Sequence, residues 1–155
     1  MQEIVLEQLE AFVVKAKAAT YVGDGEESPS CRPASHDLQF QGGDFAYLDS
    51  YFGGVDFIGE EVVYYKGEPV WAMNYYGRIL EPGMISAAEA GQIIKQSLTE
   101  MYKEGRFLGG FLHDTGNGVY HDTSEGDVTS FTGKEWITRQ GAIVYDLVYH
   151  GGLIK

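Results

Sequence analysis

Two stretches of this sequence resemble each other and decide how the chain can fold. Residues 57–77 read FIGEEVVYYKGEPVWAMNYYG, and residues 131–151, which lie 74 positions further on, read FTGKEWITRQGAIVYDLVYHG. Seven positions are identical: Phe57/Phe131, Gly59/Gly133, Glu61/Glu135, Gly67/Gly141, Val70/Val144, Tyr75/Tyr149 and Gly77/Gly151. Runs of Tyr, Val, Ile and Trp on both sides of a glycine turn are typical of antiparallel hairpins. Two hairpins of this composition could look alike by chance, but we favour an internal duplication.

The flanking residues extend the repeat. Tyr47-Leu-Asp49-Ser50 recurs as Tyr120-His-Asp122-Thr123, and each unit is preceded by a helical pattern. A stripe of apolar residues at helical spacing predicts the first helix over residues 3–19. Ser86 and Glu89 form a capping box that begins the second helix. We therefore expect an α+β fold in one domain, residues 1–155, with an antiparallel, β-rich sheet and two helices. Its halves are two helix-plus-four-strand units at about 3–80 and 86–152.

Composition narrows the classes of function. The chain has 155 residues, 44% of them hydrophobic, and a net charge of −12 with 11 basic residues, so we expect no direct contact with nucleic acid. Cys31 is the only cysteine, which excludes a disulfide framework and a thiolate zinc cluster. No apolar run is long enough to span a bilayer, and residues 1–3 do not start a signal peptide. The expected compartment is the cytoplasm.

Strand alternation gives the candidate site. It assigns Glu61 and Glu135 to an unusually apolar face of the two hairpins. The opposite face, assigned to the core, includes Trp71, Trp136, Ile143 and Tyr145. A carboxylate among apolar neighbours has a raised pKa and suits proton transfer or a cationic ligand. The predicted pocket consists of Glu61, Asn74, Tyr76, Glu135, Asp146 and His150. The alternative places both glutamates at a sheet rim, solvated or paired with Arg78 and Arg139.

Three histidines are followed by aspartate: His36-Asp37, His113-Asp114 and His121-Asp122. With a two-residue turn at Asn117-Gly118, His113 would face Asp122 and Asp114 would face His121. This geometry favours cross-strand ion pairs over a shared metal centre. We expect no metal and no cofactor.

Several motifs resemble a bacterial and archaeal family that is catalogued only as a domain of unknown function. They are Arg32-Pro33-Ala-Ser35-His36-Asp37, the run from Gly43-Asp44-Phe45 to Phe52-Gly53-Gly54, Phe57-Ile-Gly59-Glu60-Glu61, and Pro69-Val70-Trp71-Ala-Met73-Asn74-Tyr75-Tyr76-Gly77. The resemblance implies a domain that occurs alone or after an XRE-type helix-turn-helix domain. It implies no activity and no site residues.

Three functions remain open at this point. The leading hypothesis is a small-molecule-binding or regulatory, sensor-like domain without catalysis. The second is a small hydrolase or isomerase in which Glu61 or Glu135 is the general base, assisted by His36, His113 or His121. The third is an interaction module, like an antitoxin or immunity protein, whose acidity suits a basic protein partner.

Overall fold

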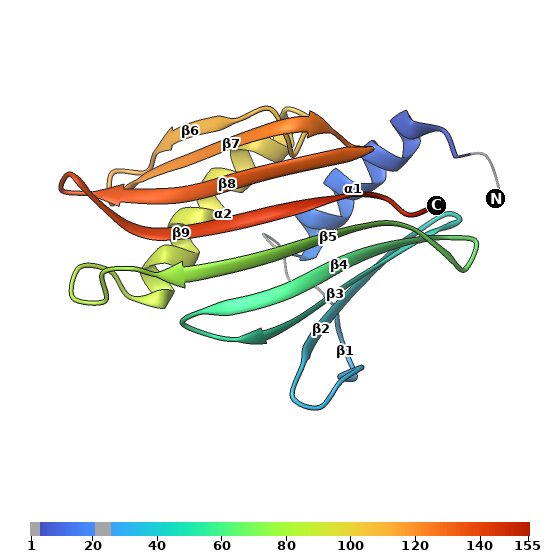
Figure 1. Ribbon diagram of the computed structural model, residues 1–155, viewed down its shortest axis with the longest axis horizontal. Helices are drawn as coiled ribbons and strands as arrows, with labels where there is room; N and C mark the ends of the chain where they lie inside the picture. Colours follow the sequence, from blue (N-terminus) through green and yellow to red (C-terminus); the bar gives the residue numbers. More distant parts are fainter. Residues whose placement is uncertain (1–3, 21–25) are drawn as a thin grey trace.

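The computed structural model describes residues 4–20 and 26–155, which form one sheet covered on one face by two helices (Figure 1). The elements in chain order are α1 (Leu6–Thr20), β1 (Glu26–Ser28), β2 (His36–Gly42), β3 (Phe45–Gly53), β4 (Phe57–Tyr65), β5 (Glu68–Ile79), α2 (Ala87–Lys103), β6 (Phe111–Asp114), β7 (Val119–Asp127), β8 (Ser130–Arg139) and β9 (Ala142–Leu153). Every pair of neighbouring strands is antiparallel, in the order β1-β2-β3-β4-β5-β9-β8-β7-β6. The predicted α+β class is confirmed.

Both predicted helices are present. α1 starts at Leu6, and the predicted start at Glu3 lies outside the described residues. The Ser86 hydroxyl accepts a hydrogen bond from the Glu89 N–H, and the Glu89 carboxylate accepts one from the Ser86 N–H. The capping box is therefore formed as predicted, because it satisfies two backbone donors at the start of α2. No helix in the described part of the chain is long and apolar enough to cross a membrane.

The centre of the sheet lies between β5 and β9. On one side β3, β4 and β5 form a meander, and on the other side β7, β8 and β9 form a second one. Tyr75 pairs directly with Tyr149 across the β5–β9 junction, and these two residues are separated by the 74 positions of the sequence repeat. The register thus agrees with the sequence alignment, while descent of the two halves from one unit stays a prediction.

Each hairpin contains a β-bulge that the sequence analysis did not foresee. The β4–β5 register shifts between Val63 and Tyr64 of β4, so that Val70 is an extra residue in β5. The β8–β9 register shifts between Ile137 and Thr138 of β8, so that Val144 is an extra residue in β9. A shift of one residue moves every later side chain to the other face of the sheet. The bulges therefore place Glu61 opposite Met73 and Glu135 opposite Leu147, on the face that the helices cover.

The turns of the two hairpins also match. Lys66 and Gly67 have φ values of 50° and 87°, and Gln140 and Gly141 have φ values of 51° and 80°. Two positive φ angles in a two-residue loop fit the twist of an antiparallel hairpin and favour glycine at the second position. This explains the identical pair Gly67/Gly141.

Candidate functional site

Four carboxylates are buried between the sheet and the helices. The relative exposures are 2% for Asp49, 4% for Glu61, 6% for Asp122 and 5% for Glu135. Asp49 and Glu61 are direct cross-strand neighbours on β3 and β4, as are Asp122 and Glu135 on β7 and β8. Carboxylates are rarely buried to this degree unless they are paired. We call these four residues the carboxylate cluster.

A lysine from α1 holds the carboxylate of the first half. Lys17 is 5% exposed, and its Nζ lies 2.9 Å from both carboxylate oxygens of Glu61. The same Nζ lies 3.6 Å from the Met73 sulfur and 5.4 Å from the centre of the Phe107 ring. The Tyr47 hydroxyl also donates to Glu61. Across residues 4–20 and 26–155, Lys17 is the one Lys or Arg that forms an ion pair with any member of the carboxylate cluster.

Tyrosine hydroxyls hold the carboxylates of the second half. Tyr145 donates to Glu135 at 2.9 Å and Tyr149 donates to Asp122 at 2.7 Å. The Tyr120 hydroxyl contacts both Glu135 and Asp122. A hydroxyl has one hydrogen and can donate it to only one carboxylate, so the second contact is satisfied when a carboxyl group carries a proton. This geometry favours one shared proton in the second half.

Two glycines allow tyrosines to reach the aspartates. The hydroxyl of Tyr75 donates to Asp49 at 2.7 Å, in the same way as that of Tyr149 donates to Asp122. A Cβ atom at Gly59 would lie 2.4 Å from the Tyr75 hydroxyl oxygen, and one at Gly133 would lie 2.0 Å from Cζ of Tyr149. Each ring therefore lies over a glycine of the neighbouring strand. The identical pairs Gly59/Gly133 and Tyr75/Tyr149 serve the same arrangement in both halves.

Burial sets the protonation of the cluster. Burial, reinforced by the charge of Asp122, raises the pKa of Glu135 to about 7. Burial raises the pKa of Asp122 to about 6, although hydrogen bonds from Tyr149 and Tyr120 lower it in part. Burial and the nearby charge of Glu61 also raise the pKa of Asp49. Burial therefore favours the protonated forms of these carboxyls, and a cation in contact with the cluster would favour the ionised forms.

A small cavity opens onto this cluster. It has a volume of about 50 Å³ and is lined by Lys17, Glu61, Met73, Tyr75, Leu98, Tyr102, Phe107, Asp122, Glu135, Leu147 and Tyr149. Asp49 and Tyr75 also line a second cavity of about 310 Å³, which is bounded by Phe57 and by Ile94 of α2. The first has room for an ammonium group or a few water molecules. The second is of the size that holds small ligands.

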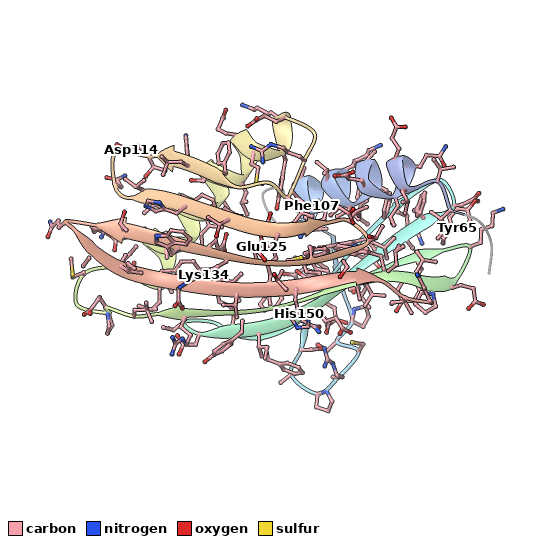
Figure 2. All side chains as sticks on the ribbon, turned by 45° about the horizontal axis from the view of Figure 1, so that its top comes forward. Tyr65, Phe107, Asp114, Glu125, Lys134 and His150 are labelled. Carbon is pink, nitrogen blue, oxygen red and sulfur yellow. The ribbon has the colours of Figure 1, made fainter. Side chains whose placement is uncertain are left out.

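The six residues of the predicted pocket do not lie together. Glu61 and Glu135 belong to the helix-covered side, whereas Asn74, Tyr76, Asp146 and His150 lie on the free face of the sheet. Figure 2 labels two residues of this free face, Lys134 on β8 and His150 on β9. The prediction of one shared pocket is wrong, because the bulges at Val70 and Val144 interrupt the alternation on which it relied. Whether any of the six residues binds a ligand stays a prediction.

The alternative partners of the glutamates are also corrected. Arg78 pairs with Asp146 at 3.6 Å, and Arg139 donates to the Met84 carbonyl at 2.6 Å and contacts Glu89 at 3.5 Å. Neither arginine reaches Glu61 or Glu135, which lie in the interior of the protein and not at a solvated rim. The predicted core faces change accordingly: Trp136 and Ile143 lie on the free face, with Ile143 largely exposed.

The predicted cross-strand His–Asp pairs are wrong. The hairpin has a four-residue loop over residues 115–118, so that His113 pairs with Tyr120 and Asp114 pairs with Val119. His113 contacts the Ser97 hydroxyl at 3.0 Å, and His121 stacks on Trp136 and contacts Thr138. Within the described residues no group of three His, Cys, Asp or Glu side chains could hold a metal ion. None of His36, His113 and His121 lines the cavity at the carboxylate cluster.

Three important members of this site were not predicted from the sequence. Asp49 and Asp122 were visible as the repeated Tyr-X-Asp motif, and their repetition was the signal that could have placed them beside Glu61 and Glu135. Lys17 was hidden, because a lysine near the end of an amphipathic helix is normally read as a solvated charge that favours the helix dipole. Its burial depends on how α1 packs on the sheet.

A comparison with models of protein families identifies the family of this chain. The model of a domain of unknown function, DUF5680, matches residues 49–154. The chain belongs to the DUF5680 family. The match covers the whole carboxylate cluster of this DUF5680 domain, whereas Lys17 and Tyr47 precede the matched residues. Comparisons with curated proteins and with solved structures gave no match.

Proposed function

We propose that this DUF5680 domain is a small-molecule-binding, regulatory domain without catalysis, and that its ligand carries an ammonium or guanidinium group. The observation that supports the proposal is the charge of the interior. Among the described residues, the four members of the carboxylate cluster share a single ion-paired ammonium, that of Lys17. An excess of buried negative charge is costly, and a cation reduces this cost as protonation does.

The surroundings of Lys17 support this choice of ligand group. Its ammonium contacts a carboxylate, a thioether sulfur and the Phe107 ring. Carboxylates together with aromatic faces are the usual partners of organic cations. A ligand ammonium placed near Asp122 and Glu135 would meet carboxylates and tyrosines in the same way. The ligand body would extend to the cavity beside Asp49 and Tyr75.

The regulatory part of the proposal rests on α1. Lys17 lies on this helix and Glu61 lies on β4, so their ion pair joins the helix to the sheet. A ligand cation beside Glu61 competes with Lys17 and changes the free energy with which α1 packs on the sheet. A ligand can shift such an equilibrium only by its difference in affinity for the two states.

The test is ligand-induced thermal stabilisation with a series of alkylammonium and alkylguanidinium chlorides, compared with sodium chloride at equal ionic strength. At least one organic cation should raise the melting temperature of the wild type, and the rise should grow from about pH 5 to about pH 8 as Glu135 and Asp122 lose protons.

The double variant Glu61→Gln/Glu135→Gln should lose this stabilisation. The matched control is Glu60→Gln/Glu125→Gln, which removes two exposed carboxylates from the free face of β4 and β7. The proposal is rejected if the control loses the effect as fully as the core variant does. It is also rejected if no organic cation exceeds sodium chloride.

A further inference from the structure

The free face of the sheet carries a groove that is separate from the carboxylate cluster. The groove has a volume of about 450 Å³, within the range of small-molecule sites, and it lies over β4, β5 and β9. The loop between β1 and β2 forms one wall through Arg32, whose guanidinium lies 4.9 Å from the centre of the Phe52 ring and donates to Ser50. Both helices lie on the other side of the sheet (Figure 1).

Two rows of side chains cross the floor of the groove. One row is polar and consists of Glu60, Asn74 and His150, which pair directly across the three strands. The parallel row is apolar and consists of Ile58, Tyr76 and Val148, with exposures of 54%, 42% and 52%. Neighbouring strands are about 4.8 Å apart, so each row spans about 10 Å. A ligand lying across the strands would meet hydrogen-bonding groups along one edge and an apolar surface along its face.

The polar row is free to bind a ligand. In the described part of the chain, the side chains of Glu60, Asn74 and His150 form no hydrogen bond or ion pair with another residue. Glu60 accepts hydrogen bonds, while Asn74 and a neutral His150 each offer both a donor and an acceptor. Hydroxyl groups, which donate and accept at once, are the complementary partners of such a row.

The charge of this groove differs from that of the whole molecule. The negative charge of Glu60 and the positive charge of Arg32 balance within the groove, although the whole chain has a net charge of −12. A balanced site gives no preference for an anion or a cation, and the surrounding acidity repels phosphate groups. The ligand class that fits is neutral, rich in hydroxyl groups, and apolar on one face.

We propose that the groove binds a neutral carbohydrate, with the C–H face of a sugar ring on Tyr76 and its hydroxyl groups on Glu60, Asn74 and His150. Aromatic rings give large contact area at a low cost in side-chain entropy, and the neighbouring Ile58 and Val148 extend this contact surface. The site is independent of the proposed cation site, because the two lie on opposite faces of the sheet.

The experiment titrates the full chain with methyl glycosides of neutral hexoses and N-acetylhexosamines, followed by NMR chemical shifts and calorimetry. The comparison ligands are glucosamine and glucose 6-phosphate. A neutral glycoside should bind the wild type more tightly than either charged sugar. Tyr76→Ala and Asn74→Ala should each weaken binding by about tenfold or more, which corresponds to about 1.4 kcal/mol.

Matched controls exist on the same face outside the groove. Ile143→Ala removes an apolar side chain that is 49% exposed, and Thr132→Ala removes a hydroxyl next to His150. Both should bind the glycoside as the wild type does. The proposal is overturned if no neutral glycoside binds at millimolar concentration or if the charged sugars bind as tightly as the neutral ones. It is also overturned if Tyr76→Ala and Asn74→Ala both bind the glycoside with wild-type affinity.

Discussion

Lys17 is the residue on which the charge balance of the interior depends. Its ammonium and the Glu61 carboxylate are both almost fully buried, and both oxygens of Glu61 lie within 2.9 Å of it. Removing one member of a buried pair leaves the other without compensation, which costs much more than the pair itself contributes. The two residues should therefore behave as a unit.

Lys17→Met should lower the free energy of unfolding by about 3 kcal/mol, because Glu61 stays buried without its cation. Lys17→Met/Glu61→Gln should recover part of this loss, since a neutral amide oxygen can still accept the hydrogen bond of Tyr47. Urea unfolding of the double-mutant cycle measures both values. The control Lys103→Met removes an exposed pair with Glu100 and should change stability by less than about 0.5 kcal/mol. Equal losses for the two lysines would contradict the pairing.

Glu135 and Asp122 should give the protein an unusual dependence of stability on pH. Both carboxyls have a higher pKa when folded than when unfolded, so the folded state binds more protons between about pH 4 and pH 7. Their contribution to stability is fully present at the acidic end of this window and is lost as the pH rises through the folded pKa values. Asp37 acts in the opposite sense: three hydrogen-bonded partners outweigh its burial and lower its pKa to about 2, so its contribution is lost only below about pH 4.

At constant salt concentration, we expect the free energy of unfolding to fall by a few kcal/mol between about pH 4.5 and about pH 7.5. Glu135→Gln should flatten this fall, because it removes the group whose pKa is raised to about 7. Denaturant unfolding at a series of pH values gives the slope. A wild-type stability that rises through this window would mean that the cluster is ionised without penalty.

At the scale of the strands, the rings of Tyr75 and Tyr149 each lie over a position on the neighbouring strand that must have no side chain. Gly59→Ala and Gly133→Ala should each displace the overlying ring, break the tyrosine–aspartate hydrogen bond and destabilise the protein by about 2–3 kcal/mol. Gly91→Ala is the control, because nothing lies within 4 Å of its added Cβ on α2. That substitution should leave stability unchanged or raise it by up to about 1 kcal/mol. Melting temperatures of the three variants test the difference.

At the scale of the whole molecule, β5 and β9 join the two halves into one sheet. Tyr75 pairs with Tyr149 at the junction, and the Trp71 indole donates across it to the Val128 carbonyl at 3.0 Å. Neither meander could keep its inner edge covered without the other. The sheet should therefore unfold as one unit, as the prediction of a single domain requires.

Trp136→Phe leaves Trp71 as the only tryptophan and makes fluorescence a reporter of the junction between the two halves. Its urea transition should coincide with that of the far-ultraviolet circular dichroism, which reports all strands. Trp71→Phe leaves Trp136 as the reporter of the second half and should again give coincident transitions. Separate midpoints for the two halves would divide residues 1–155 into two cooperative units.

Local patterns predicted much of this fold. Hairpins at residues 57–77 and 131–151, the capping box at Ser86 and the two helices could be predicted because each depends on neighbours in the chain. The pairing of Glu61 with Glu135 as equivalent positions also came from the sequence repeat. The burial of both glutamates was left open, because the sequence also allowed a solvated position at a sheet rim.

Only the tertiary structure decided which residues meet. The bulges at Val70 and Val144 each add one residue and change the face of the strand that follows, and alternation in the sequence carries no mark of this. The loop over residues 115–118 separates His113 from Asp122 by a shift in register for the same reason. Lys17 enters the interior because α1 packs over Glu61, a contact between residues 44 positions apart. Local preference fixes the elements, while register and packing are set by the free energy of burying all of them together.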